Sequence, residues 1–277
     1  MYPESIADAV ILSSGTRMPL LGVGTFRSAP GQETTHSVAA ALQIGYRSVD
    51  TASMYENEAN VGEAILASGI PREELFVASK VWNDEQGYEG TLAAFERSRG
   101  RLGLDYLDLY LVHWPVPRLM AGTWRAMEEL HASGRARAIG VCNHLIAHLE
   151  VLLALAEVVP AVNQVEFHPR LQQPALQQFC VQHRIQVEAW APLMRGGVFQ
   201  IPEIVEIAGR HAKTPAQVTL RWMMQKRVVT IPKSVHEERL RENADIFDFE
   251  LSPAEIDAID ALDSGQRLGR HPDSFSS

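Results

Sequence analysis

The sequence predicts an α/β fold in which eight parallel strands, each followed by a helix, close into a (β/α)8 TIM barrel. Apolar runs of strand length alternate with longer segments of helical period, which is the pattern of repeated βα units. The composition does not shift along the chain, and its 277 residues suit one barrel, for which about 250 are typical. We therefore expect a single barrel domain over residues 1–277.

Eight short apolar runs are the expected barrel strands. They contain many β-branched, Leu and aromatic residues and lie between Gly, Pro or polar positions. The expected strands are 21–25, 47–50, 76–80, 107–113, 137–143, 161–166, 186–191 and 228–232. Ahead of them, the segment AVILSSGTRMPL indicates an N-terminal β-hairpin that turns at Ser14 and Gly15.

Segments of helical period lie between these strands. The expected helices are 32–44, 57–67, 88–101, 121–133, 146–157, 174–183, 215–226 and 235–246. Thr214 and Pro215 supply the N-cap and the first helical position of one of them. Two extra helices do not fit the simple repeat, and they are 202–211 after the seventh strand and 253–262 near the C-terminus.

An open, doubly wound sheet is the alternative to a closed barrel. Such a sheet would bind a dinucleotide through GxGxxG after the first strand. This chain has GVGTFR at 22–27, which lacks the third glycine. Eight βα units without a break in composition favour the barrel.

Composition and charge limit the class of partner. The chain is 46% hydrophobic and 21% charged, as expected of a globular protein with a large core. A net charge of −9 without a run of Lys and Arg argues against nucleic acid as a partner. Cys142 and Cys180 are the two cysteines, so no disulfide framework or structural zinc site is expected. No signal peptide or membrane-length apolar window appears, so we expect a cytoplasmic protein with no membrane partner.

Four ionisable side chains lie at or just after the ends of expected strands. Asp50, Lys80 and His113 end the second, third and fourth strands, and Tyr55 follows in the loop after Asp50. In a barrel, these strand ends share the face that carries the active site. An ammonium beside a phenol lowers the phenol's pKa from about 10. Asp50 would keep Lys80 charged, and His113 would hydrogen-bond a substrate oxygen, so the quartet suits protonation of a carbonyl.

Each of these residues alone also has an ordinary structural explanation. Asp50 would cap the turn that begins at Thr51, a lone Tyr commonly packs half-buried, and a strand-end Lys is commonly solvated. Their occurrence together at successive strand ends is what indicates function.

Three motifs, in order along the chain, carry a resemblance to a known family. They are GYRSVDTASMYENEANVG at 45–62, LGLDYLDLYLVHWP at 102–115 and IPKSVHEERLREN at 231–243. They resemble the three signatures of the aldo-keto reductases, and the resemblance covers almost the whole chain. It implies an NADP-dependent oxidoreductase whose catalytic residues are Asp50, Tyr55, Lys80 and His113, with Tyr55 as the general acid.

Carbonyl reduction also requires a hydride, which no side chain supplies, so a nicotinamide cofactor is expected. The sequence IPKS ends the eighth strand at the start of a helix, whose free N–H groups and positive dipole end attract a phosphate. Lys233, Ser234 and Arg239 add charge and hydrogen bonds there. From the residues alone, an ordinary basic helix start remains the alternative. With the resemblance, the cluster favours NADP(H) over NAD(H).

The resemblance also implies the other contacts to NADP(H). Glu242 and Asn243 would contact the adenine, Cys142, Asn143 and Gln164 would bind the carboxamide, Trp190 would stack on the nicotinamide, and Thr25 and Leu193 would complete the site. Two positions depart from the family's pattern, with Cys142 where many relatives have Ser and His236 where some have Arg. A thiol is the weaker hydrogen-bond partner, and His236 would soften the preference for the extra phosphate. We still expect NADPH to be favoured, because Lys233 and Arg239 remain.

Aromatic residues are expected to line the substrate pocket beside His113. Phe26, Trp82 and Trp114 follow the first, third and fourth strands, although packing at the barrel rim would also explain them. The short segment after HWP and the polar tail at 265–277 predict an open, permissive pocket.

These features resemble the bacterial 2,5-diketo-D-gluconate reductases, whose relatives also reduce methylglyoxal. The implied substrates are small carbonyl compounds, including α-dicarbonyls. Arg195, Arg270 or His271 would meet a carboxylate on such a substrate.

Two other functions remain to be compared with this one. A metal-dependent hydrolase would need paired ligands such as HxH, which are absent from the sequence. His144 and His148 have no evident acidic third ligand near them. We therefore expect both histidines to face solvent, and we expect no metal. An NADPH-binding barrel that reports redox state without turnover remains open. Relatives are often monomeric, which implies a monomer here.

Overall fold

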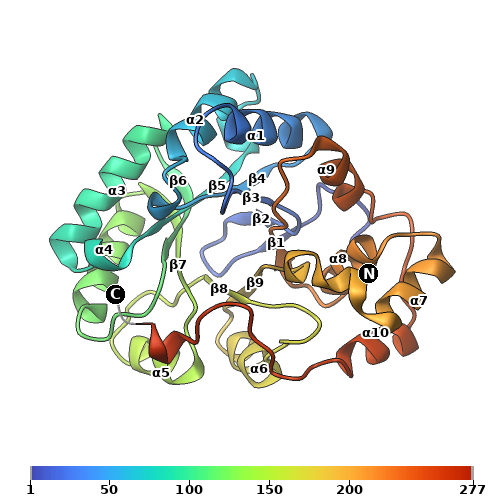
Figure 1. Ribbon diagram of the computed structural model, residues 1–277. Coiled ribbons are helices and arrows are strands. Elements are labelled where there is room, and N and C mark those ends of the chain that lie inside the picture. The colour runs from blue at the N-terminus through green and yellow to red at the C-terminus, as the bar shows by residue number, and fades with distance from the viewer. Residues whose placement is uncertain (1, 276–277) are drawn as a thin grey trace.

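The computed structural model, which describes residues 2–275, is a closed barrel of eight parallel strands surrounded by helices (Figure 1). The strands run in the order β3 to β10 around the barrel, each paired in parallel with the next along the chain. Strands β3 and β10 meet through Gly22 N–H to Thr230 O at 2.9 Å and Thr230 N–H to Leu20 O at 2.9 Å. These bonds join the two edges, so the predicted barrel is confirmed and the open sheet is excluded.

The elements alternate as predicted. The strands are β1 (Ala9–Ile11), β2 (Arg17–Pro19), β3 (Val23–Gly24), β4 (Ser48–Asp50), β5 (Phe76–Val81), β6 (Leu107–Val112), β7 (Ala136–Cys142), β8 (Val162–Glu166), β9 (Gln186–Trp190) and β10 (Val229–Thr230). The helices are α1 (Gln32–Ile44), α2 (Glu58–Ala67), α3 (Tyr88–Leu102), α4 (Met120–Ala132), α5 (Ile146–Leu153), α6 (Pro174–Gln182), α7 (Pro202–His211), α8 (Pro215–Gln225), α9 (Glu237–Ala244) and α10 (Pro253–Asp260). Five short 3-10 helices join them, η1 (Ser53–Tyr55), η2 (Arg72–Glu74), η3 (Asn83–Glu85), η4 (Met194–Gln200) and η5 (Pro272–Ser274).

Glycine allows the seam of the barrel to close. A Cβ added to Gly24 would lie 2.9 Å from the carbonyl oxygen of Ile231, and one added to Gly22 would lie 2.8 Å from Ser48 Oγ. Real Cβ atoms essentially never come so close to another heavy atom. The two glycines of GVGTFR are therefore explained by close approaches between neighbouring strands at the seam, and not by a dinucleotide loop.

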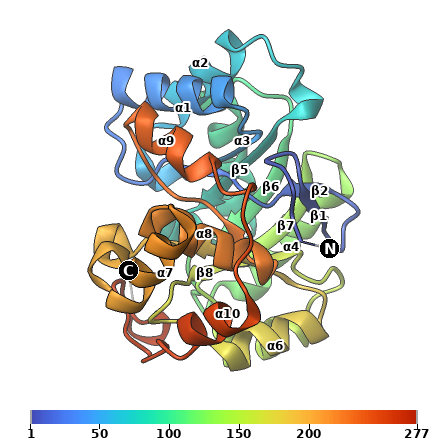
Figure 2. The ribbon, with the colours of Figure 1, turned by 90° about the vertical axis from the view of Figure 1, so that its right-hand side faces the viewer.

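The N-terminal hairpin lies at the opposite end of the barrel from the C-terminal segment (Figure 2). Strands β1 and β2 pair antiparallel, and the turn places Gly15 at a φ of 83°. Leu12 and Met18 are buried, and Thr16 Oγ1 donates to Arg137 O at the start of β7. The predicted hairpin is confirmed, and Leu12 and Met18 join the core, while Ile11 faces solvent.

The two extra helices, α7 and α10, are also present, and both pack against α8. Trp222 Nε1 on α8 donates to Asp260 Oδ1 of α10 at 2.7 Å, and Lys226 Nζ is 2.6 Å from Asp260 Oδ2. Ser252 and Thr214 cap α10 and α8 by accepting a backbone hydrogen bond three residues ahead.

Several predicted helices are shorter in the structure, among them 253–262, which ends at Asp260, and two have a clear local reason. Helix α5 ends at Leu153 rather than 157, because the Glu128 carboxylate accepts the N–H groups of Glu157 and Val158 and draws the chain out of the helix. Helix α9 begins at Glu237 rather than 235, because His236 N–H bonds to Ser234 Oγ in a turn before it. None of the helices within residues 2–275 is long and apolar enough to cross a bilayer.

Candidate active site

A buried ion pair lies at the ends of two neighbouring strands. Lys80 of β5 and Asp50 of β4 are almost without solvent contact, and Lys80 Nζ lies 2.6 Å from Asp50 Oδ1. Lys80 Nζ also donates to the carbonyl oxygen of Thr51 at 2.8 Å. Burial is the largest single effect and opposes the charge on Lys80, but Asp50, Tyr55 and Cys142 together outweigh it, so the pKa of Lys80 is raised and the ammonium stays protonated.

Tyr55 is presented to this pair by a short 3-10 turn. Its hydroxyl lies 3.3 Å from Lys80 Nζ, which donates to it. The turn is held by Asn57, whose amide donates to Thr25 O at 3.0 Å and Ser28 O at 3.2 Å and accepts from Thr51 Oγ1 at 2.9 Å. The loops after β3 and β4 therefore converge on one buried amide beside the tyrosine.

The pKa of Tyr55 depends on burial as well as on the charge of Lys80, which was expected to lower it. Burial raises the pKa of Tyr55 more than the Lys80 charge lowers it, so the pKa lies above its usual value of 10.0. The expectation of a lowered pKa was wrong because it left out the cost of burying a phenolate. The phenol stays protonated at neutral pH, which a proton donor requires.

His113 completes the group as a neutral ring. Its ring centroid lies 5.7 Å from that of Tyr55 and 4.9 Å from that of Trp82, edge to face in both cases. Burial, with a smaller contribution from Lys80, holds the pKa of His113 well below 6.5. Its Nδ1 has no hydrogen-bond partner among the described residues. A neutral imidazole can donate one hydrogen bond to a substrate oxygen.

A second set of polar side chains continues around the barrel from Asp50. Gln164 Nε2 on β8 donates to Asp50 Oδ2 at 2.9 Å, and the fully buried Cys142 Sγ lies 3.8 Å from Gln164 Oε1. Asn143 Nδ2 donates to His113 O at 2.9 Å, and Trp190 Nε1 donates to Asn143 Oδ1 at 2.8 Å. These four predicted carboxamide and nicotinamide residues thus lie together at the strand ends.

The predicted phosphate site has cations without carboxylate partners. Lys233 and Arg239 form no ion pair among the residues that the structure describes, and both are exposed. Partial burial lowers the pKa of Lys233, an effect that Glu33 opposes. His236 at the start of α9 provides no side-chain cap, so the helix N–H groups stay free. Unpaired cations at an uncapped helix start fit the phosphate of a dinucleotide.

The remaining predicted cofactor residues flank this helix and the loop after β9. Glu242 Oε1 accepts from Thr214 Oγ1 at 2.7 Å, which links α9 to α8, and Asn243 is buried. Leu193 is half-buried at the start of η4. Thr25 is buried and donates through Oγ1 to Asp50 O at 3.0 Å, so it also fixes the strand that carries the ion pair.

The C-terminal segment brings an additional aromatic ring to the mouth. Phe26 lies 5.0 Å from the Tyr55 ring, while Phe275 packs at 4.4 Å from the Trp114 ring and 6.0 Å from the Trp82 ring. The prediction of an open mouth was wrong on this side, because the polar appearance of the tail hid its one phenylalanine. Arg270, a predicted carboxylate contact, lies with its guanidinium 5.0 Å from the Phe275 centroid.

Glu166 fixes the tail in this position. Its carboxylate accepts the backbone N–H groups of Leu268 and Gly269 and is paired with His168 Nε2 at 3.1 Å. Although burial raises its pKa, these donors outweigh burial and the pKa of Glu166 is lowered. Figure 1 shows the resulting path of the red segment, from α10 past α6 to α5.

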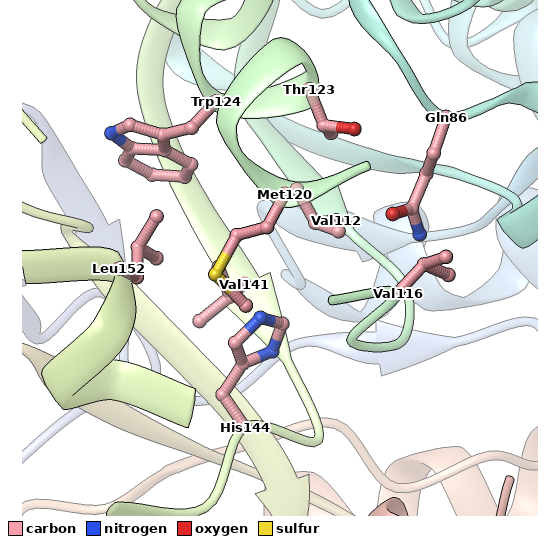
Figure 3. Close-up of a pocket in the computed structure, with 9 residues that line it drawn as sticks. All are labelled: Gln86, Val112, Val116, Met120, Thr123, Trp124, Val141, His144 and Leu152. Atoms are coloured by element: carbon pink, nitrogen blue, oxygen red, sulfur yellow. The ribbon is translucent and has the colours of Figure 1, made fainter. Parts of the chain in front are cut away.

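His144 does not face solvent as predicted. It is buried behind the barrel wall, where burial lowers its pKa to about 3, and its Nδ1 lies 2.7 Å from Cys142 O. Figure 3 shows its ring among apolar side chains around a cavity of about 10 Å³, room for about one water. His148 is half-buried and lies 3.3 Å from Asp273 Oδ1 of the tail. Within residues 2–275, no group of three or more His, Cys, Asp or Glu could hold a metal ion.

Left-handed backbone recurs directly beside the site residues. Arg27, Glu56 and Ala191, which follow Phe26, Tyr55 and Trp190, have φ values of 62°, 59° and 53°. Such conformations are costly for residues other than Gly and cluster where side chains must be held in unusual directions.

Three residues of the site were missed in the sequence: Asn57, Glu166 and Phe275. Glu166 did carry a signal, since an acid inside an apolar strand requires a partner. Asn57 lies within the first motif, but its three loop contacts depend on tertiary structure. No local pattern places Phe275 at the mouth.

Comparisons with known proteins agree with this geometry. Residues 20–264 match the model of the aldo/keto reductase family. The chain is 55% identical over 273 residues to the glyoxal reductase of Bacillus subtilis (strain 168), covering 99% of both chains. It is 44% identical over 268 residues to the methylglyoxal reductase DkgA of Salmonella typhimurium (strain LT2), covering 95% of this chain and 96% of that protein.

A solved structure is also similar throughout. A mutant of Gox0644 in complex with NADPH is 42% identical and superposes with a TM-score of 0.93, covering 98% of this chain and 99% of that chain. The family resemblance seen in the three sequence motifs is confirmed, and the chain belongs to the aldo/keto reductase family of oxidoreductases.

Proposed function

We propose that the protein reduces small aldehydes, ketones and α-dicarbonyls such as methylglyoxal, glyoxal or 2,5-diketo-D-gluconate to alcohols, with NADPH as the reductant. The observation that carries this proposal is the contact of the Tyr55 hydroxyl with the buried Lys80–Asp50 pair. A protonated phenol beside a fixed ammonium can give its proton to an oxygen that becomes negative as the carbonyl carbon is reduced.

The residues of the site divide this work. Tyr55 donates the proton, Lys80 stabilises the phenolate that remains, and Asp50 keeps Lys80 charged and directed at the hydroxyl. His113, neutral at working pH, donates a hydrogen bond to the same substrate oxygen and orients the carbonyl. Tyr55 is reprotonated from solvent after the product leaves.

NADP(H) supplies the hydride when bound. We propose that Trp190 supports the nicotinamide, that Asn143 and Gln164, with Cys142 behind them, hold its carboxamide, and that Lys233, Ser234 and Arg239 hold the phosphate of the adenosine ribose. Glu242 and Asn243 would contact the adenine, while Thr25 and Leu193 would line the same groove. The unpaired cations at the start of α9 support this assignment.

The aromatic side chains at the mouth would bind the substrate. Phe26, Trp82 and Trp114 present flat apolar surface beside His113, which suits a small carbonyl compound better than a large polar one. Arg195, Arg270 or His271 would meet the carboxylate of an acidic substrate. Replacement of these residues should then raise the KM for 2,5-diketogluconate and leave that for methylglyoxal unchanged.

The first experiment follows NADPH absorbance with glyoxal, methylglyoxal, 2,5-diketogluconate, an aromatic aldehyde and a simple ketone. Tyr55→Phe should lower kcat by about 10²–10⁴-fold, the usual contribution of a general acid. Tyr106→Phe is the matched control, because Tyr106 precedes β6 at the other end of the barrel and should leave kcat unchanged.

The outcome also separates this function from redox sensing. Tight NADPH binding without consumption for any carbonyl would reject the reductase and favour a barrel that reports redox state to a partner. Both free cysteines are buried and unpaired in the described residues, which suits a reducing compartment. We further propose that residues 1–277 form one domain and that the protein is a cytoplasmic monomer. Sedimentation of the purified protein would test whether it is a monomer.

A further inference from the structure

Glu188 is a buried carboxyl group with no place in the catalytic scheme above. It lies on β9 between Val187 and Ala189, and only 1% of its surface is exposed. Its Oε2 accepts a hydrogen bond from Gln164 Nε2 at 2.7 Å. A carboxyl group in the interior of a barrel is costly unless it is paired or protonated.

The same amide nitrogen joins Glu188 to the catalytic ion pair. Gln164 Nε2 donates to Glu188 Oε2 and to Asp50 Oδ2, at 2.7 Å and 2.9 Å. The other oxygen of Asp50 lies 2.6 Å from Lys80 Nζ, and Lys80 donates to the Tyr55 hydroxyl. A continuous chain of hydrogen bonds therefore runs from Glu188 to the proton donor.

The charges in this chain do not balance if both carboxyls are ionised. The titratable groups that face Glu188 are Asp50 from β4, Lys80 from β5 and Cys142 from β7. Burial raises the pKa of the Cys142 thiol well above 9.0, so the thiol stays neutral. Among these groups of the described residues, Lys80 is then the cation that faces two carboxyls. Asp50 touches Lys80 directly and takes the negative charge, while burial and then the Asp50 charge raise the pKa of Glu188 to about 8.

We propose that Glu188 is a positioning residue that carries a proton at neutral pH and, on losing it, weakens Tyr55 as an acid and ends carbonyl reduction on the alkaline side. The ionised Glu188 adds a second negative charge next to Asp50. That charge opposes the Lys80 field at the Tyr55 oxygen, so the phenol holds its proton more firmly and transfers it more slowly.

The pKa values of four neighbouring groups of the site are moved away from that range. The pKa values of Tyr55 and Lys80 are raised, that of Cys142 is raised, and that of His113 is lowered. The proposal rests on Tyr55 being the proton donor. Beyond that function, the proposal names Glu188 as the group that sets the alkaline limit of carbonyl reduction.

The first test needs no catalysis. Infrared spectra of the protein without cofactor should show the band of a protonated carboxyl at pH 7, which disappears with a midpoint near pH 8 and is missing in Glu188→Gln. Absence of that band from the wild type at neutral pH would overturn the proposal. If no carbonyl is reduced at all, the proposed function fails, yet this titration still decides whether Glu188 is protonated.

The second test is the pH profile of kcat at saturating substrate, between about pH 6 and pH 10. The wild type should lose activity with a midpoint near pH 8. In Glu188→Gln, whose amide imitates the protonated acid, kcat at pH 7 should stay within about twofold and the loss should move up by about one pH unit or more. Glu188→Met, also uncharged, should show the same shift and serves if the first variant folds poorly.

Glu58→Gln is the matched control. Glu58 is an equally buried carboxyl, but it bonds to Ser79 and Arg101 on the outer side of β5 and does not reach Asp50. Its profile should keep the wild-type midpoint. An unchanged midpoint in Glu188→Gln, or an equal shift in Glu58→Gln, would overturn the positioning role.

Discussion

At the scale of single residues, the position of Lys80 shows how much depends on its partners. A buried ammonium is tolerated because Asp50, Thr51 and Tyr55 take its three hydrogens. Loss of one partner from a buried ion pair costs about 3–5 kcal/mol, because the other charge is left without compensation. Removal of Asp50 would therefore leave the Lys80 charge buried without compensation.

Lys233 decides the preference for NADPH if the helix start of α9 binds the extra phosphate. Lys233→Met should raise the KM for NADPH by about tenfold or more, since one hydrogen bond to a charged group is worth about 1.5–3 kcal/mol. The KM for NADH, which lacks that phosphate, should stay unchanged. Steady-state kinetics with both cofactors measures the effect.

Lys213→Met is the control for this change of charge. Lys213 is already paired with Asp245 and Asp248, at 2.9 Å and 2.8 Å, so its removal should not alter the preference. Equal catalytic efficiency of the wild type with NADPH and NADH would contradict the assignment of the extra phosphate to this helix start.

Residue by residue, the sequence allowed prediction of the side chains that carry charge at strand ends. Asp50, Lys80 and His113 needed only the strand boundaries, because all barrel strands end on one face. The net direction of the Tyr55 pKa and the burial of His144 could not be predicted, because both depend on the packing of distant elements.

At the scale of elements, periodicity was enough to place every barrel strand and helix, but the tail required three-dimensional contacts. The segment after α10 has no period of its own and is fixed by Glu166 through two backbone N–H groups. This path of the tail requires a glycine at position 269, because a Cβ there would lie 2.5 Å from Trp190 Cη2.

Gly269→Ala should therefore push Trp190 or the tail out of place. We expect a KM for NADPH that rises several-fold and a change in tryptophan emission, because the indole that would support the nicotinamide has to move. Gly100→Ala is the matched control. It adds the same methyl group to α3, where nothing lies within 4 Å, and should leave the kinetics unchanged.

A Gly269→Ala variant with unchanged cofactor affinity and emission would show that the tail is not coupled to Trp190. The same kinetics also report on Phe275, since movement of the tail would withdraw its ring from Trp114 and Trp82. Substrate ranking should then shift toward bulkier aldehydes.

At the scale of the whole molecule, two buried groups make stability depend on pH in opposite directions. Glu188 has a folded pKa of about 8 against 4.5 unfolded, so the native state loses stability as pH rises between those values. His144 has a folded pKa of about 3 against 6.5, so the native state loses stability as pH falls between those values. Between pH 4.5 and pH 6.5, the effects of these two groups on the free energy of unfolding cancel.

The acid side of this balance can be tested through His144 itself. The unfolded chain takes up a proton on His144 below pH 6.5, while the folded chain does so only near pH 3. One such group changes the free energy of unfolding by about 1.4 kcal/mol per pH unit. His144→Asn keeps a donor for Cys142 O and removes the titration, so its free energy of unfolding should fall less steeply between pH 6.5 and pH 4 when urea titrations are compared.

His183→Asn, at an exposed histidine, is the control, and its free energy of unfolding should depend on pH as that of the wild type does. If His144→Asn and the wild type lose stability in parallel, His144 is protonated in the folded protein and the apolar environment in Figure 3 does not exclude its charge.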